Sequence, residues 1–106
     1  MPVMSTGRRS TRADAIANAL RNLLPRAPAR ELVAIAEQAA ASHGLRRGRP
    51  EAVAWLSAVA WIRHNLTEYD DLLAEGYDHE SARHFTATAI DAVLAEWGCR
   101  LRVREE

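Results

Sequence analysis

Side chains able to do chemistry gather at one point of this sequence, directly after its most apolar stretch. Ten of the eleven residues at positions 52–62 are apolar, and Ser57 is the exception. Five polar side chains follow, which we call the polar cluster: Arg63, His64, Thr67, Tyr69 and Asp70. Arginine offers a planar fork for phosphate, tyrosine a stacking face for a base, and histidine a group suited to general base catalysis.

The polar cluster has three interpretations. In the first, it is a structural corner in which Thr67 caps a following helix, Asp70 completes a capping box, and an arginine–aspartate pair and a tyrosine hydroxyl bond tie the turn. In the second, Arg63, His64 and Tyr69 stay partly exposed and contact a phosphate or a base. In the third, His64 is a general base that Asp70 orients. The sequence favours the structural corner and disfavours an enzyme, because it holds no nucleophile elbow, glycine-rich phosphate loop or second acid–base pair.

Other potential ligands and nucleophiles are scattered along the chain. The four histidines show no i, i+4 pair that would place two metal ligands on one helical face: His43, His64, His79 and His84. Cys99 is the single cysteine, so it forms no intrachain disulfide, and we interpret it as incidental. The tryptophans lie in apolar stripes and are predicted to be core residues: Trp55, Trp61 and Trp97. We therefore predict no catalytic residue, no cofactor and no metal.

Charge is distributed unevenly, although it sums to zero. All 14 basic residues are arginine; residues 1–50 hold nine of them against three acids, and residues 51–106 hold five against eleven. Such asymmetry indicates a nucleic-acid or protein partner, or two halves that neutralise each other within one fold.

The arginines of the first half suggest a basic face. The candidate nucleic-acid contacts come from an N-terminal arm, from the loop before position 50 and from the polar cluster: Arg8, Arg9, Arg12, Arg46, Arg47, Arg49 and Arg63. Such a face would contact phosphates without sequence preference. A near-neutral isoelectric point and the lack of a recognition-helix motif weigh against it. The alternative is a protein–protein interaction or homo-oligomerising module whose opposed halves pair head to tail.

Hydrophobic periodicity and end signals predict the elements that carry these residues. Helices are expected at about residues 12–24, 29–42, 50–65, 68–75 and 79–97. Their boundaries carry caps, prolines and glycines: Thr11, Pro25, Gly44, Pro50, Gly76, Asp78 and Gly98. The central helix, apolar all round, should be buried, which predicts an all-α fold: a compact bundle of four main helices plus one short helix around it. Among the inward positions we include Val33 and Phe85, with Leu101 resting on the core.

Length and composition predict one domain at residues 11–98, with a flexible basic arm at 1–10 and a flexible tail at 99–106. Residues 1–12 have no apolar segment of the kind found in signal peptides. The longest apolar run is shorter than the ~20 residues a membrane helix needs, so no membrane partner is expected. Together with the single cysteine, this suggests a cytoplasmic protein.

The polar cluster and the residues after it resemble a known bacterial and fungal family, domain of unknown function 2293. The resemblance rests on the stretch 60–70, with Arg63-His64, Thr67 and Tyr69-Asp70, and on a set of later positions: Leu72, Leu73, Gly76, Asp78, Ala82, Arg83, Ile90, Val93, Leu94 and Trp97. It spans about residues 29–97. The family has no established activity, so the resemblance implies one structural unit and no catalytic assignment.

Overall fold

The computed structural model describes residues 11–42 and 47–104, and within them the protein is all-α. Five helices follow one another: α1 (Arg12–Leu23), α2 (Ala29–Ala41), α3 (Pro50–Leu66), α4 (Tyr69–Ala74) and α5 (His79–Glu96). The predicted fold class is confirmed, and the predicted helix boundaries agree to within one or two residues. The predicted arm at 1–10 and Gly44 lie outside the described residues.

The ends of the helices form where local signals predict them. The Thr11 hydroxyl accepts the Asp14 amide at 3.0 Å and the Asp14 carboxylate accepts the Thr11 amide at 3.1 Å, which makes a complete capping box on α1. Asp78 caps α5 by accepting the Ser81 amide at 2.8 Å, and this hydrogen bond lowers the pKa of Asp78.

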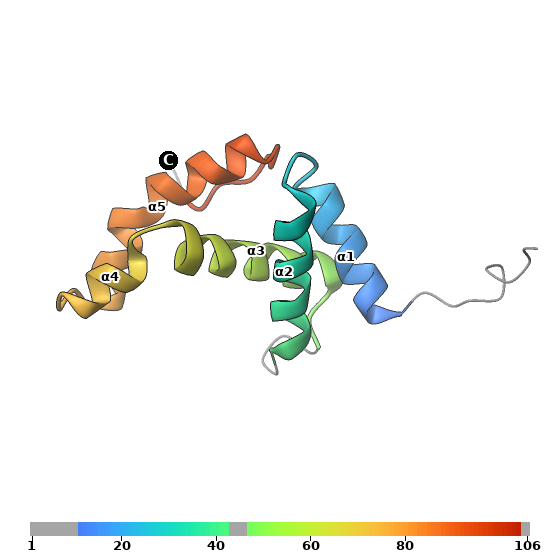
Figure 1. Cartoon of the computed structure of the whole chain (residues 1–106), viewed down its shortest axis with the longest axis horizontal. Helices are drawn as coiled ribbons and strands as arrows, with labels where there is room; N and C mark the ends of the chain where they lie inside the picture. The colour runs from blue at the N-terminus through green and yellow to red at the C-terminus, as the bar shows by residue number, and fades with distance from the viewer. Residues whose placement is uncertain (1–10, 43–46, 105–106) are drawn as a thin grey trace, which may run out of the picture.

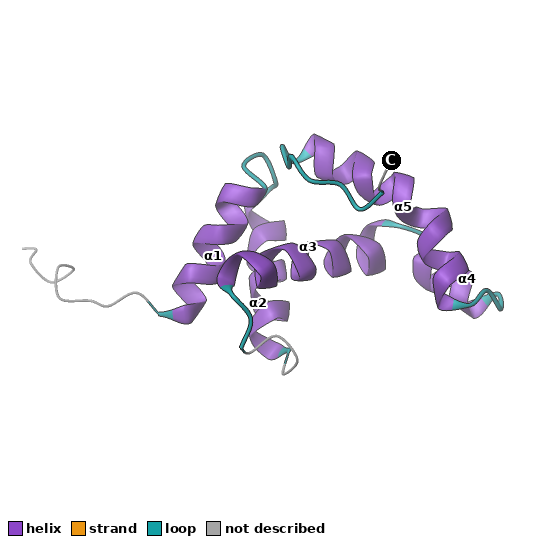
Figure 2. Ribbon diagram, turned by 180° about the vertical axis from the view of Figure 1, so that it is seen from behind, coloured by secondary structure: helices purple, strands orange, loops and turns teal. Residues whose placement is uncertain are grey.

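The helices form two arms joined by α3 (Figure 1). The α1–α2 hairpin crosses the first half of α3, while α4 turns the chain back so that α5 covers the second half, as Figure 2 shows from behind. At the far end of α5 the arms meet again, because the Arg26 amide donates to the Trp97 carbonyl at 2.9 Å. The α3–α4 corner therefore lies at the opposite end of the molecule from the α1–α2 hairpin.

The core follows α3 from end to end. Its most buried side chains come from all four long helices and from the C-cap of α1: Leu20, Leu24, Ile35, Val53, Ile62, Ile90 and Leu94. Leu56 is 51% exposed, so the prediction that α3 is buried on every side is wrong at that position. The helix has neighbours at its two halves and not all round, which leaves one stripe open.

Three inward positions were also predicted wrongly. Val33, Phe85 and Leu101 are all more than half exposed. On α5 the buried row instead includes Thr86, one residue beyond Phe85, because α5 is covered on one side only. In the C-terminal segment Cys99 is buried and Val103 half-buried, while Leu101 points away from the core. The Asp91 carboxylate holds the C-terminal segment in this position, because it accepts hydrogen bonds from the backbone amides of Val103 at 2.6 Å and Arg104 at 3.2 Å.

Candidate functional site

The turn between α3 and α4 is tied by a threonine. The Thr67 hydroxyl donates to the Arg63 carbonyl at 2.6 Å and accepts the Tyr69 amide at 3.1 Å. The predicted capping box is wrong, because Glu68 is the N-cap of α4 and its side chain makes no capping hydrogen bond. The Asp70 carboxylate is instead directed back toward α3.

Asp70 pairs with the histidine of the polar cluster and not with its arginine. Its Oδ1 lies 2.8 Å from Nδ1 of His64, and both side chains are about half exposed. The arginine–aspartate pair of the structural interpretation is therefore wrong, although a tie across the corner exists. An ionised carboxylate only accepts hydrogen bonds, so the His64 Nδ1–H donates and Nε2 faces away from the pair.

Tyr69 is the buried centre of the cluster, with 3% of its surface exposed. Its hydroxyl lies 2.9 Å from Nδ1 of His79, the His64 ring meets it edge-on, and the Arg63 guanidinium carbon lies 5.5 Å from its ring centroid. The expectation that Tyr69 stays exposed to stack on a base is wrong, because all of its faces are covered. His79 therefore contacts the cluster, which was not predicted from the sequence. The one sequence feature that indicates this contact is the position of His79 at the start of α5, just beyond the short α4.

Arg63 is charged and half-buried, and it has no carboxylate partner in the described part of the chain. Its Nε is fully buried without a hydrogen-bond partner. Burial lowers the pKa of Arg63, and the nearby Arg83 guanidinium lowers it further, while Tyr69 opposes the shift. Within the described residues, no carboxylate forms an ion pair with Arg63.

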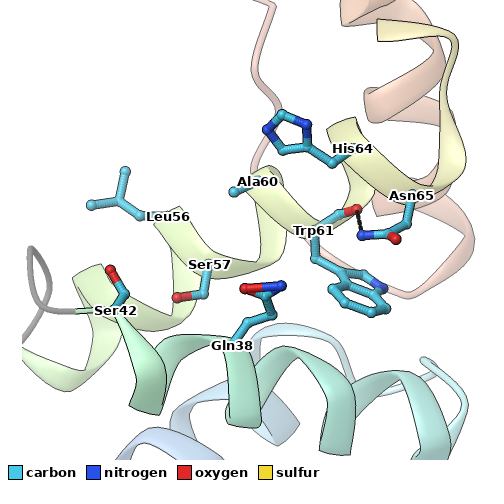
Figure 3. A pocket seen from close by; sticks show the side chains of 8 residues that line it. All are labelled: Gln38, Ser42, Leu56, Ser57, Ala60, Trp61, His64 and Asn65. Carbon is cyan, nitrogen blue, oxygen red and sulfur yellow. Dashed lines mark hydrogen bonds between the residues drawn. The ribbon is translucent and has the colours of Figure 1, made fainter. Parts of the chain in front are cut away.

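A pocket of about 200 Å³ between α2 and α3 adjoins the cluster through His64 (Figure 3). Neutral polar and apolar side chains make up the rest of its lining: Gln38, Ser42, Leu56, Ser57, Ala60, Trp61 and Asn65. The Ser57 hydroxyl is buried there without a partner. It precedes His64 by seven residues, about 10 Å along the helix, which is too far for a nucleophile–base hydrogen bond. Ser57 therefore lies out of reach of the His64–Asp70 pair.

The basic residues predicted as one face divide between two places. The Arg12 guanidinium donates to the Gly48 carbonyl, so the start of α1 lies against the loop that carries the exposed Arg47 and Arg49. Three further candidates lie outside the described residues: Arg8, Arg9 and Arg46. Arg63 lies 14 residues after Arg49, about 21 Å farther along α3, and the structure does not bring it to this loop.

The other candidates from the sequence are metal ligands, the single cysteine and the tryptophans. Among residues 11–42 and 47–104 no group of three or more histidine, cysteine or acidic side chains could hold a metal ion. Cys99 is 4% exposed and packs in the core. Trp97 is buried, while Trp55 and Trp61 pack half-buried against the core, where the Trp61 indole donates to the Glu31 carboxylate at 2.7 Å. None of the described helices combines the length and apolar character needed to cross a membrane.

Comparison with known proteins gives one match. The model of the family described as "Uncharacterized conserved protein (DUF2293)" matches residues 19–98. The match starts earlier than the resemblance at 29–97 and takes in the end of α1, the α1–α2 loop, α2 and both sides of the polar cluster. Searches of curated proteins and of solved structures found no match. The matched residues make up most of the chain, and it therefore belongs to the DUF2293 family.

Proposed function

We propose that this chain is a small helical binding module that contacts the phosphate backbone of nucleic acid through the arginine face, by which we mean Arg12, Arg47 and Arg49. The observation that carries the proposal is the hydrogen bond from Arg12 to the Gly48 carbonyl. Gly48 lies between Arg47 and Arg49, so this bond joins two arginine-bearing segments and spans 36 residues of the sequence.

The charge of the two segments supports this proposal. Residues 8–14 and 46–51 hold six arginines against two acids, Asp14 and Glu51. Arg47 and Arg49 are exposed, and exposed arginines attract phosphate over a distance of about 10 Å at moderate salt. Contacts of this kind position a nucleic acid without reading its sequence.

The test is fluorescence anisotropy of labelled duplex DNA, single-stranded DNA and RNA over a salt series from about 50 to 200 mM. We expect affinity to fall steeply with salt. The variant Arg47→Glu/Arg49→Glu should bind much more weakly. If each arginine neutralises one phosphate, milder Arg→Gln changes should reduce the salt slope by about 2.

A matched control changes the net charge equally at a distance from the arginine face. Arg30, in the first turn of α2, and Arg100, in the C-terminal segment, are both exposed. Arg30→Glu/Arg100→Glu should therefore retain most of the binding. Equal loss in both double variants would mean that net charge alone matters, and no binding at low salt would exclude the proposal and favour self-association, which light scattering measures.

A further inference from the structure

Arg63 and Arg83 carry like charge and act on each other electrostatically in the acidic part of the chain. Residues 51–98 contain nine acidic residues and only these two arginines. In a fold that paired charges for stability, each arginine would face a carboxylate. The two guanidinium groups instead lie close enough for Arg83 to lower the pKa of Arg63.

Within residues 11–42 and 47–104, neither arginine forms an ion pair with a carboxylate. Asp70 is engaged by His64 at 2.8 Å, and Asp78 accepts the Ser81 amide at 2.8 Å. The Nε–H of Arg63 is fully buried and donates to nothing. A buried unpaired donor costs free energy, so the fold keeps donor capacity and positive charge that its own contacts do not use.

The surrounding side chains hold this cationic group in place. The Arg63 guanidinium lies over the buried Tyr69 ring, and the Tyr69 hydroxyl is bonded to Nδ1 of His79. When the hydroxyl donates to Nδ1, the His79 ring is neutral and carries its proton on Nε2 as a further donor. His79 and Arg83 are four residues apart on α5, so they share one helical face beside Arg63.

We propose that Arg63, Arg83 and His79 form a binding site for the phosphate group of a phosphorylated ligand. Two guanidinium groups match the charge of a phosphate monoester, which is between −1.5 and −2 near neutral pH, and their planar forks suit its oxygens. The site lies at the α3–α4–α5 corner, and the arginine face lies at the other end of α3. The inference therefore goes beyond the proposed nucleic-acid contact and does not depend on it.

The experiment measures thermal unfolding and backbone amide NMR shifts of the full chain in inorganic phosphate and in chloride at equal ionic strength. We expect phosphate to raise the Tm progressively with concentration and to shift amide signals of residues 63–83. Arg83→Gln keeps the fold, because Arg83 is exposed. It should weaken phosphate binding by about tenfold or more, and Arg63→Gln should do the same.

A second readout separates a binding site from a structural role. In chloride, Arg83→Gln should melt at the same temperature as the parent or higher, because it removes the repulsion on Arg63. The control Arg30→Gln and the arginine-face variant Arg47→Glu/Arg49→Glu should keep the phosphate response. A phosphate response that is absent from the parent, or unchanged in Arg83→Gln, would overturn the proposal whatever the outcome of the nucleic-acid experiment.

Two further ligands distinguish the source of the phosphate. A nucleoside 5′-monophosphate and a short oligonucleotide of the same base are titrated into the parent and into Arg83→Gln. If the parent binds the monophosphate and Arg83→Gln does not, the site is assigned to a free phosphorylated molecule. If the parent binds the oligonucleotide more tightly and Arg83→Gln loses that binding, the site is assigned to a nucleic-acid chain. If Arg83→Gln changes neither titration, the proposal is wrong.

Discussion

Nδ1 of His64, at the end of α3, lies 2.8 Å from Oδ1 of Asp70, in the first turn of α4. Since 49% and 59% of the two side chains are exposed, water screens the attraction between them. The pair therefore orients the corner more than it stabilises the fold. Its contribution to the free energy of unfolding should therefore be small.

A double-mutant cycle of His64→Ala and Asp70→Ala, followed by urea unfolding, measures this contribution. We expect a coupling free energy of about 0.2–1 kcal/mol. High salt should reduce it. Each single variant should keep nucleic-acid binding at the arginine face, so loss of that binding in Asp70→Ala would contradict a structural role for the pair.

Local signals account for what the sequence predicted correctly. The Thr11 capping box, the Asp78 cap and the positive φ angles of Gly76 and Gly98 need only residues within one turn. The apolar stretch at 52–62 likewise marks the central helix, because no other segment could lie against so many neighbours.

Positions that depend on the packing of other helices could not be predicted. Leu56 and Phe85 are apolar and have helical spacing, but whether a neighbour covers them depends on where the α1–α2 hairpin and α5 cross α3. The contact between Tyr69 and His79 depends on the length of α4 and on the turn after it. The same turn brings Arg83 within electrostatic range of Arg63, which the spacing of 20 residues does not indicate.

The buried Ser57 hydroxyl predicts a stabilising substitution. Its Oγ lacks a hydrogen-bond partner, and an unsatisfied buried hydroxyl costs about 1–3 kcal/mol. Ser57→Ala removes that hydroxyl and introduces a better helix former. We expect the free energy of unfolding to rise by about 1 kcal/mol, measured by urea denaturation.

The matched control is Thr86→Val, because the Thr86 hydroxyl is also buried but donates to the Ala82 carbonyl at 2.8 Å. This variant removes a hydrogen bond that is made, so it should not gain stability as Ser57→Ala does. A loss of stability in Ser57→Ala would show that the hydroxyl has a partner in solution, such as a water in the adjoining pocket.

Two glycines with positive φ give a prediction about the joint between α5 and the α1–α2 loop. At Gly76, with φ of 106°, an added Cβ meets nothing within 4 Å; at Gly98, with φ of 82°, it lies 3.0 Å from Cγ of Pro25. Gly76→Ala should cost about 1–2 kcal/mol from backbone strain alone. Gly98→Ala should cost about 1–3 kcal/mol more, because it also forces the loop away from α5. If urea unfolding shows that both variants lose the same free energy of unfolding, the α1–α2 loop moves aside at no energetic cost.

The Asp91 carboxylate predicts protection of the C-terminal segment. It accepts the amides of Val103 and Arg104, while the sequence predicted a flexible tail at 99–106. Three trypsin sites lie in the segment at Arg100, Arg102 and Arg104, so digestion reports how often it opens. A hydrogen bond to a charged group contributes about 1.5 kcal/mol or more, and its loss raises the open population about tenfold. Asp91→Ala should therefore be cut at these arginines about tenfold faster than the parent under brief digestion.

The control Glu96→Ala changes an exposed acid of the same helix and should leave the rate of tryptic cleavage unchanged. Cleavage that is equally fast in the parent and in Asp91→Ala would show that the segment is flexible in solution, as the sequence predicted, and that Asp91 does not retain it.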